Sequence, residues 1–244
     1  MPGGKNVGSF TDIHSHMLSG VDDGAHDDNE MFLMLDMAYK TGTRRICLTP
    51  HFNPEIWGDN NQRFEDAFAR LSEYTAKNYP DMSLYTGNEI CYSQSSIGQL
   101  NRRECKTLNG GKHVLVDFHP GESYYAIRSA LLDLMGYGYI PVLAHAEGYE
   151  CITSTLDELH ELNWLGVVIQ LSASSLIGRR GEPLRKKTFK ILKKGLADVV
   201  ASDAHNITTR PPCLDGAAKI LSKLCGENCA ALLLRINPDK ILGL

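Results

Sequence analysis

Short apolar segments alternate with amphipathic segments along most of this chain. The apolar segments are rich in Val, Ile and Leu, which is typical of parallel strands that are buried on both faces. We predict strands at Phe10–His14, Arg45–Pro50, Ser83–Glu89, Lys112–Phe118, Ile140–His145, Gly166–Leu171 and Asp198–Asp203.

The segments between these strands have the periodicity of amphipathic helices. We predict helices at Asn29–Thr41, Gln62–Asn78, Tyr124–Met135, Thr153–Leu162, Leu184–Lys194 and Leu214–Cys225. Gly42, Gly136 and Gly195 follow three of them, at the position where glycine commonly ends a helix. Repeated strand–helix units predict an α/β protein with a parallel sheet. The number of strands fits a TIM-like barrel that is one unit short better than it fits an open sheet.

Composition and charge narrow the class of protein. Hydrophobic residues make up 43% and charged residues 22% of the 244 residues, which excludes a disordered chain, a collagen-like fibre and a coiled coil. We see no linker composition, so we expect a single domain over residues 1–244 in which residues 1–9 are flexible. The net charge of −4 leaves no broad basic surface, so we expect no nucleic-acid partner.

Cysteine usage and hydropathy indicate the compartment. The seven Cys include no Cys-x-x-Cys pair, so we expect neither a disulfide framework nor a zinc ribbon. The N-terminus has no apolar signal-peptide core, and the apolar run Ala230–Leu234 is far shorter than the roughly 20 residues of a membrane span. We therefore expect a cytoplasmic protein without membrane insertion, and we leave its oligomeric state open.

Imidazoles and carboxylates gather at the ends of the predicted strands. They are Asp12, His14, His16, His51, Glu89, Asp117, His119, His145, Asp203 and His205. The carboxyl ends of the strands in a parallel barrel open onto one face, where active sites are built. His14 and His16 are two positions apart, so both rings are expected on the same side of the strand. Asp203 and His205 have the same spacing.

This donor set suits a metal ion. Neutral imidazoles together with carboxylates fit Mn, Fe or Zn. Glu89 is able to bridge two ions with its two oxygens, and ions held close together lower the pKa of a bound water and bind a phosphoryl oxygen. We interpret His26, His113 and His160 as ordinary residues, and Asp117 is a better candidate ligand than His119.

Several motifs together resemble a known family. Asp12-Ile13-His14-Ser15-His16 with Val21-Asp22-Asp23-Gly24 is similar to the opening of the polymerase-and-histidinol-phosphatase (PHP) superfamily. The other motifs are Thr49-Pro50-His51, Gly87-Asn88-Glu89-Ile90, Ala144-His145-Ala146-Glu147, Ala201-Ser202-Asp203-Ala204-His205-Asn206 and Arg210-Pro211-Pro212. They resemble the bacterial protein-tyrosine phosphatases of capsular and exopolysaccharide operons. The resemblance extends from about residue 10 to Asn237-Pro238.

The resemblance implies a distorted (β/α)₇ barrel of the PHP fold with two or three ions, Mn²⁺ first, with Fe or Zn as alternatives. It implies hydrolysis of phosphotyrosine on the tail of a cognate bacterial tyrosine kinase, which regulates polysaccharide synthesis. The first ion would be held by His14, His16, Glu89 and Asp203, and the second by Glu89, Asp117 and His145. The third would be held by His51, His205 and one of Asp22 or Asp23, of which we favour Asp23. We place His205, Arg210 and Asp203 in catalysis, His205 or a water as the proton donor and Arg210 on the phosphoryl oxygens.

Two positions depart from the family pattern. The family usually has Glu where this chain has Asp117, so the second ion is expected to sit differently or to bind more weakly. The family has Arg in a His-x-Glu-Arg-Tyr stretch where this chain has Gly148, and that arginine would be expected to hold the phosphate. Arg210 remains, and Arg179 and Arg180 are the candidates to replace the missing residue.

Three other functions compete with this interpretation. Cys229 and Arg235 fit the Cys-x5-Arg spacing of a cysteine phosphatase, but the intervening residues lack the glycines of a phosphate-binding loop, so we interpret Cys229 as core packing. A PHP-type phosphatase with a small substrate such as histidinol phosphate would use the same ions. A weakly active PHP-fold binding protein is the third alternative, because of Gly148.

Overall fold

The computed structural model describes residues 9–244. The segment that was expected to be flexible, residues 1–9, therefore lies almost entirely outside the described residues. The strands within residues 9–244 are β1 (Phe10–Asp12), β2 (Thr43–Leu48), β3 (His51–Phe52), β4 (Ser83–Thr86), β5 (Glu89–Cys91), β6 (His113–Asp117), β7 (Ile140–Leu143), β8 (Val168–Ser172) and β9 (Val199–Ala201). Every pairing between them is parallel, as predicted.

The strands occupy seven positions around a barrel, because two predicted strands are each broken in two. β2 and β3, separated by Thr49 and Pro50, together fill one strand position of the barrel. β4 and β5 together fill the next position. β2 pairs with β1 and β4, and β3 pairs with β5. The order around the barrel is therefore β1, then β2 with β3, then β4 with β5, then β6, β7, β8 and β9. Pro50 has no amide hydrogen to donate to a ladder, which explains the first break.

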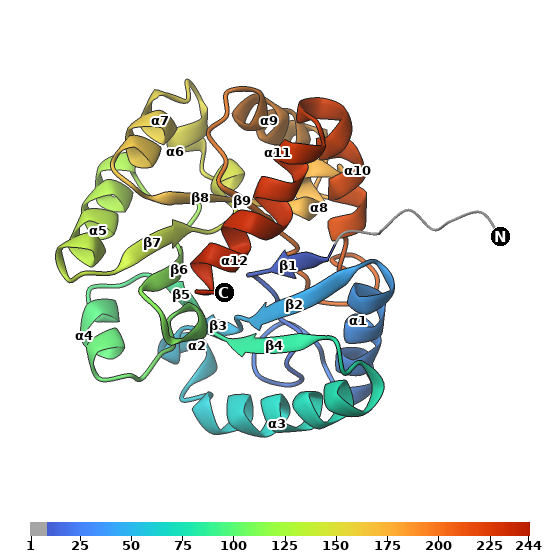
Figure 1. Ribbon diagram of the computed structural model, residues 1–244. Coiled ribbons are helices and arrows are strands. Elements are labelled where there is room, and N and C mark those ends of the chain that lie inside the picture. The colour runs from blue at the N-terminus through green and yellow to red at the C-terminus, as the bar shows by residue number, and fades with distance from the viewer. Residues whose placement is uncertain (1–8) are drawn as a thin grey trace.

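The barrel closes between its first and last strands. Ser15 forms an isolated parallel bridge with Ala204, and the Asp203 amide donates a 3.0 Å hydrogen bond to the His14 carbonyl oxygen. The buried carboxylate of Asp12 accepts a 3.0 Å bond from the Ser202 amide at the same seam. The predicted distorted (β/α)₇ barrel is therefore confirmed, and Figure 1 looks down its axis.

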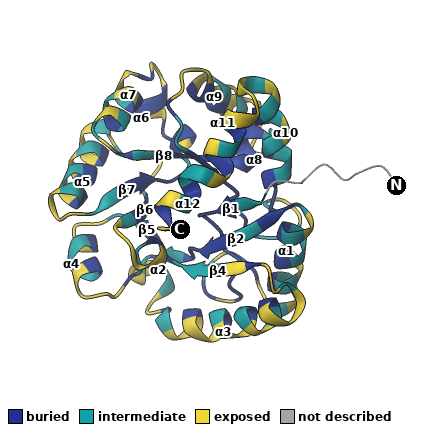
Figure 2. Cartoon of the chain, viewed as in Figure 1, coloured by how far each residue is buried: buried dark blue, intermediate teal, exposed yellow. Residues whose placement is uncertain are grey.

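Helices surround the barrel (Figure 1). They are α1 (Asp28–Lys40), α2 (Pro54–Trp57), α3 (Asn61–Asn78), α4 (Ser96–Asn101), α5 (Tyr124–Gly136), α6 (Glu150–Thr153), α7 (Asp157–Trp164), α8 (Ala173–Leu176), α9 (Glu182–Lys193), α10 (Leu214–Cys225), α11 (Glu227–Ala231) and α12 (Asn237–Ile241). Short helical turns lie at Leu108–Gly110, Ala146–Gly148 and Leu232–Ile236. Figure 2 shows buried strands at the centre and helices whose exposed sides face outward.

Two of the predicted helices are wrong, one in where it ends and the other in being continuous. α5 continues through Gly136, and the chain turns at Gly138 instead, where φ is +87° and only glycine is comfortable. The predicted helix at Thr153–Leu162 is broken between α6 and α7, because Leu156 lies in the left-handed region at φ +79°. Gly42 and Gly195 do follow α1 and α9 with positive φ, as expected.

Most strands other than β4 are buried on both faces, and β6 shows how this burial determines where a site residue points. Val114 and Val116 pack in the outer core against the helices, whereas Leu115 packs in the barrel interior. Asp117 lies two residues beyond Leu115, so its side chain falls on the interior side at the barrel mouth. The apolar pattern of the strand thus places the carboxylate.

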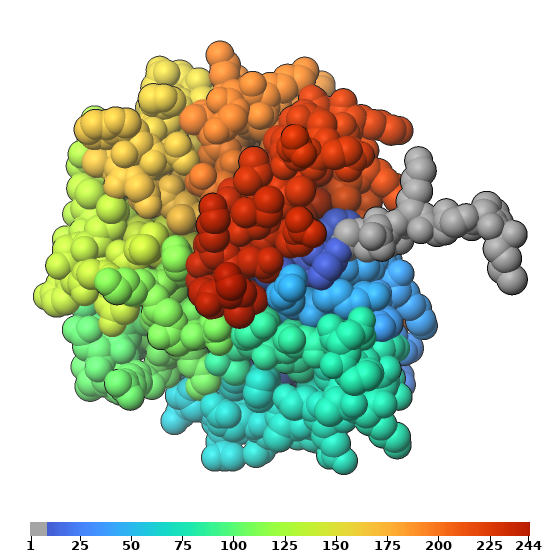
Figure 3. Space-filling view, in the orientation of Figure 1, coloured from blue at the N-terminus to red at the C-terminus, as the bar shows by residue number. Residues whose placement is uncertain are grey.

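α12 covers the opposite mouth of the barrel. Ile241 and Leu242 join the interior core, and the Asn237 amide group donates to the Asp198 carbonyl oxygen just before β9 at 2.8 Å. Thr11 donates to the Asp239 carboxylate at 2.5 Å. Figure 3 shows the C-terminal segment over the middle of this face.

Cys229 packs against the outer core, as predicted. It also forms a disulfide with Cys225, with the two Cα atoms 5.7 Å apart, a pairing that the cysteine spacing did not predict. The cause is local: α10 ends at Cys225, and Gly226 turns the chain with φ +87° so that α11 brings Cys229 back to it. In residues 9–244, no helix combines the length and the apolar character that a membrane crossing requires.

Candidate metal centre

The carboxyl ends of the strands bring the predicted imidazoles and carboxylates together. His14 and His16 follow β1, His51 opens β3, Glu89 opens β5, Asp117 ends β6, His145 follows β7, and Asp203 and His205 follow β9. Within residues 9–244 these side chains other than Asp203, together with Asp23, form three overlapping groups that could each hold an ion. The groups are His14, His16 and Glu89; Glu89, Asp117 and His145; and His16, Asp23, His51 and His205.

Glu89 lies at the centre of the cluster. Its Oε2 is 3.3 Å from His14 Nε2 and 3.2 Å from His16 Nε2, and the two imidazole nitrogens are 3.0 Å apart. Asp203 Oδ1 lies 3.5 Å from His14 Nε2 and so belongs to the same cluster of ligand atoms. All four side chains are almost completely buried. The set expected around a first ion therefore shares one small volume.

The other oxygen of Glu89 belongs to a second group. Glu89 Oε1 is 3.0 Å from His145 Nε2, and Asp117 Oδ1 is 3.7 Å from the same nitrogen. Tyr149 donates a 2.6 Å hydrogen bond to Asp117 Oδ1 and accepts a 3.0 Å bond from the Phe118 amide. Tyr149 is 1% exposed, so this buried hydroxyl fixes the position of the carboxylate.

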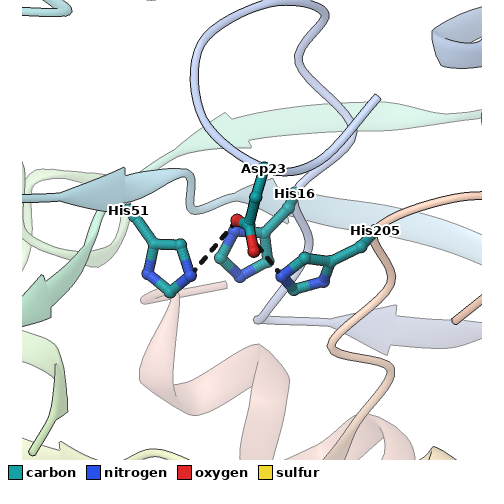
Figure 4. A group of neighbouring side chains, drawn as sticks. All are labelled: His16, Asp23, His51 and His205. Atoms are coloured by element: carbon teal, nitrogen blue, oxygen red, sulfur yellow. Dashed lines mark ion pairs between the residues drawn. The ribbon is translucent and has the colours of Figure 1, made fainter. Parts of the chain in front are cut away.

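The third group is arranged around Asp23 (Figure 4). The Asp23 carboxylate projects between two imidazoles, with Oδ1 3.4 Å from His51 Nε2 and 3.6 Å from His205 Nε2. His16 lies behind them, and its ring stacks on that of His205 with centroids 3.9 Å apart. His205 Nδ1 donates to the Asp203 carbonyl oxygen at 3.0 Å, whereas its buried Nε2 has no hydrogen-bond partner among the described residues.

Asp22 is used differently from its neighbour. Its Oδ2 accepts 2.7 Å hydrogen bonds from His16 Nδ1 and from the His51 amide, and its Oδ1 accepts from the Gly24 amide at 2.9 Å. Asp22 therefore orients His16, leaving Nε2 of that ring toward the cluster. A Cβ on Gly24 would come within 1.9 Å of the His16 carbonyl oxygen, so this tight loop requires glycine.

Gln170 is a site residue that the sequence analysis missed. Its Oε1 accepts a 3.1 Å bond from His14 Nδ1 and a 2.8 Å bond from the His145 amide. It lies in β8 with 0% exposure, between the apolar residues Ile169 and Leu171. A polar residue at such a position is the signal that could have identified it, because a buried amide needs hydrogen-bond partners.

Two non-glycine residues of the cluster have left-handed backbone. φ is +34° at His145 and +54° at Asp203, which lie two residues beyond the ends of β7 and β9. This conformation costs energy for residues with a Cβ, and such strain concentrates at functional sites. Here it turns both side chains into the mouth of the barrel.

The electrostatics of the cluster favour positive charge. Burial alone would lower the pKa of His14, but Glu89 and Asp203 outweigh burial and raise it to about 9. The same balance raises the pKa of His51 and His145 to about 9. Burial would raise the pKa of Glu89, but the imidazoles hold it well below its usual value. The site is therefore a set of buried carboxylates that require cations beside them.

Two arginines reach the rim of the cluster. Arg210 Nη2 donates to both Asp203 oxygens, at 2.8 and 2.7 Å. Arg180 Nη1 donates to Asp203 Oδ2 at 3.3 Å, whereas Arg179 Nη1 donates to the Thr208 carbonyl oxygen. Gly148 is exposed, and a Cβ there would meet no atom within 4 Å.

The remaining histidines lie outside the cluster. His119 is exposed, and its Nδ1 accepts a bond from the Gly121 amide, so Asp117 and not His119 occupies the position at the end of β6. His26 and His160 are exposed, and burial lowers the pKa of half-buried His113. His26, His113 and His160 were predicted to be ordinary and Asp117 was preferred to His119, and none of these four histidines is in the three groups found within residues 9–244.

A parallel α/β barrel with imidazoles and carboxylates at the carboxyl ends of its strands is the arrangement of a TIM-like metal-dependent hydrolase. Residues 10–243 match the family model described as "Capsular polysaccharide synthesis, CpsB/CapC". The protein belongs to the CpsB/CapC family, as the motifs predicted.

Named relatives and solved structures agree with this family. The chain is 30% identical over 236 residues to tyrosine-protein phosphatase CpsB of Streptococcus pneumoniae, covering 95% of this chain and 97% of that protein. It is 33% identical over 202 residues to putative tyrosine-protein phosphatase CapC of Staphylococcus aureus, covering 83% and 79%. The crystal structures of YwqE from Bacillus subtilis and CpsB from Streptococcus pneumoniae, described as unique metal-dependent tyrosine phosphatases, include a chain that matches with a TM-score of 0.86 and 30% identity, covering 96% and 94%.

A more distant likeness concerns the fold alone. The Escherichia coli phosphotriesterase homology protein superposes with a TM-score of 0.59 at 12% identity, covering 97% of this chain and 99% of that chain. The barrel is thus shared more widely than the family.

Proposed function

We propose that this protein hydrolyses phosphotyrosine on the tail of a cognate bacterial tyrosine kinase, in the cytoplasm, and so regulates capsular or exopolysaccharide synthesis. It is a metal-dependent tyrosine-protein phosphatase of the CpsB/CapC family, and that predicted enzyme class is confirmed. Its substrate is accordingly a phosphoprotein. The observation that carries the proposal is the gathering of eight predicted ligand side chains at one mouth of the barrel, in three groups that share residues, with a ninth, Asp203, beside the first group.

The donor set fits metal ions. Hydrogen bonds occupy the Nδ1 atoms of His14, His16 and His205, so the Nε2 atom of each ring points into the cluster. The buried, unpartnered Nε2 of His205 is the clearest indication, because an imidazole lone pair at a buried site calls for a partner.

We assign three ions to these residues. The first would be held by His14, His16, Glu89 and Asp203, the second by Glu89, Asp117 and His145, and the third by Asp23, His51 and His205. Asp22 orients His16 and is a positioning residue in this proposal. Nitrogen and oxygen ligands without thiolates favour Mn²⁺, with Fe or Zn as alternatives. Bound ions would lower the pKa of a water and neutralise charge on the phosphoryl oxygens.

The residues of this chain define the rest of the mechanism. Arg210 carries its guanidinium at the rim, where it binds an equatorial oxygen of the phosphoryl group and stabilises the charge of the transition state. Glu89 and Asp203 would hold cations, and Asp203 accepts hydrogen bonds from Arg210.

The cluster has no strong acid to donate a proton to the leaving group among its described residues. Burial and the neighbouring His16 lower the pKa of His205 to about 2, so its ring is suited to be a ligand rather than an acid. A phenolate is the leaving group of phosphotyrosine, and because its conjugate acid has a pKa of about 10 it departs with little assistance. The site is therefore better suited to an aryl phosphate than to an alkyl phosphate.

A substrate series tests the proposal against the small-molecule alternative. The Mn²⁺-loaded protein is assayed with a phosphotyrosine peptide, a matched phosphoserine peptide and histidinol phosphate. The proposal expects kcat/KM to be highest for the phosphotyrosine peptide. Preference for histidinol phosphate would assign the site to small-molecule hydrolysis, and no turnover of any substrate would favour a binding protein.

A further inference from the structure

Arg180 reaches the metal centre from a loop that the mechanism above does not use. It follows α8 and precedes α9, and its Nη1 donates to Asp203 Oδ2 at 3.3 Å. Its side chain is 37% exposed, whereas the Asp203 side chain it contacts is 1% exposed. Arg180 therefore extends from solvent down to the edge of the cluster.

The backbone of this loop is fixed, so the direction of Arg180 is determined by the fold. The Gly181 amide donates to the Gly178 carbonyl oxygen at 3.2 Å, and both glycines have positive φ, at +93° and +87°. The Arg179 amide donates to the Ser174 carbonyl oxygen at 2.9 Å, which ties the turn to α8. A tight turn bracketed by two glycines thus presents one arginine to the site and directs the other away from it.

The two guanidinium groups beside Asp203 carry one more positive charge than its carboxylate can neutralise. Asp203 carries one negative charge and already receives two hydrogen bonds from Arg210, of 2.8 and 2.7 Å. A guanidinium has five N–H donors, and the bond to Asp203 is the one hydrogen bond found for Arg180 within residues 9–244. Arg180 therefore retains donors beside the cluster for a further anion.

The adjacent loop, after β7, supplies no guanidinium at Gly148. Gly148 follows β7, the strand that pairs with β8, and lies in a short helical turn against α9. It has open space around it, and the neighbouring Glu147 is buried and accepts a bond from the Ser172 amide at 3.2 Å. A phosphoryl group at the cluster would find its guanidinium partners on the Asp203 side.

We propose that Arg180 is a substrate-binding residue that holds the phosphoryl group together with Arg210, so that one oxygen of the anion lies against each guanidinium. The inference rests on the proposed function, because it assigns the substrate phosphate to this cluster. Planar guanidinium groups bind phosphate with charge-assisted hydrogen bonds, which makes arginine better suited to this position than lysine.

The test measures binding of inorganic phosphate to the Mn²⁺-loaded full-length protein, by equilibrium dialysis, in wild type and in Arg180→Met, Arg180→Lys and Arg179→Met. Loss of a charge-assisted contact is expected to raise the phosphate Kd of Arg180→Met about 10-fold or more. Arg180→Lys should recover part of that loss. Arg179→Met removes the same charge from the same loop and should stay within about twofold of wild type.

Metal content and turnover separate the remaining explanations. All four proteins are expected to bind equal Mn²⁺, measured on the dialysed samples. An unchanged phosphate Kd in Arg180→Met, or a change that merely follows loss of Mn²⁺, would show that Arg180 only neutralises Asp203 and would overturn the inference. Absence of phosphotyrosine turnover in a wild type that binds phosphate through Arg180 would instead refute the proposed function.

Discussion

At the scale of single residues, adjacent aspartates have opposite surroundings. Asp22 is buried and accepts three hydrogen bonds, whereas Asp23 is 49% exposed and lies between His51 and His205. The sequence motif cannot distinguish them, because both belong to the same short loop. The structure assigns positioning to Asp22, and we propose ligation for Asp23.

Replacing each aspartate in turn tests this division. Asp22→Ala is expected to lower the free energy of unfolding of the metal-free protein by about 1–3 kcal/mol, because it leaves buried donors unpaired. Asp23→Ala is expected to leave that stability within about 0.5 kcal/mol, because Asp23 is half exposed, and to reduce Mn²⁺ binding. Urea unfolding in EDTA and Mn²⁺ titration measure the two effects. Equal effects of both variants on both measurements would refute the division.

Tyr149 is expected to support the second ion through Asp117. Tyr149→Phe removes a 2.6 Å hydrogen bond to Asp117 while keeping the buried ring, so the fold should persist. Loss of such an outer contact typically weakens metal binding about 10- to 100-fold, and Mn²⁺ titration should show this for one class of site. Tyr124→Phe is the matched control, since that hydroxyl contacts Glu161 away from the cluster. Equal Mn²⁺ binding in both variants would mean that Tyr149 does not position the ligand.

At the scale of elements, the site and the stability of the barrel lie at opposite ends. The proposed ligand side chains are at the carboxyl ends of the strands, whereas α12 closes the amino ends with Ile241 and Leu242 in the interior core. The amide group of Asn109, just before β6, donates to the Leu242 carbonyl oxygen at 2.8 Å. Changes in this segment should therefore affect folding without touching the chemistry.

Leu242→Ala tests the separation. Leu242 is 3% exposed, and a buried Leu→Ala change is expected to lower the free energy of unfolding by about 2–5 kcal/mol. Leu244→Ala, two residues on and 53% exposed, should change it by less than about 0.5 kcal/mol. Urea unfolding measures both, and kcat of the folded fraction should equal that of wild type. A fall in kcat without loss of stability would contradict this role of α12.

The sequence predicts a feature well when residues close together in the chain determine it, and poorly when its interaction partners are far apart in the chain. The strands, the order of units and most ligand positions follow from local patterns, because strand ends and two-residue spacing fix where a side chain points. The break at Leu156 depends on a left-handed backbone conformation set by packing, so the pattern did not reveal it. The break after Leu48 has a local cause in Pro50, but the apolar pattern alone did not reveal it. Gln170 and Tyr149 act through partners far along the chain, and such pairs appear only once the barrel is closed.

At the scale of the whole molecule, the barrel converts separate motifs into one site. The segment after β1 supplies His14 and His16, and the segment after β9 supplies Asp203 and His205. The seam between these two parts of the chain brings the four residues together. The same closure brings Arg210 and Arg180 to Asp203 from different loops. The central claim is that this assembled cluster performs metal-dependent hydrolysis of phosphotyrosine.

The most direct test of that claim is the release of phosphate from a phosphotyrosine peptide by protein first freed of metal with EDTA and then titrated with Mn²⁺. The account predicts no turnover in EDTA and recovery of turnover as Mn²⁺ is added, rising with the occupancy of the cluster. Turnover that continues undiminished in EDTA would contradict it.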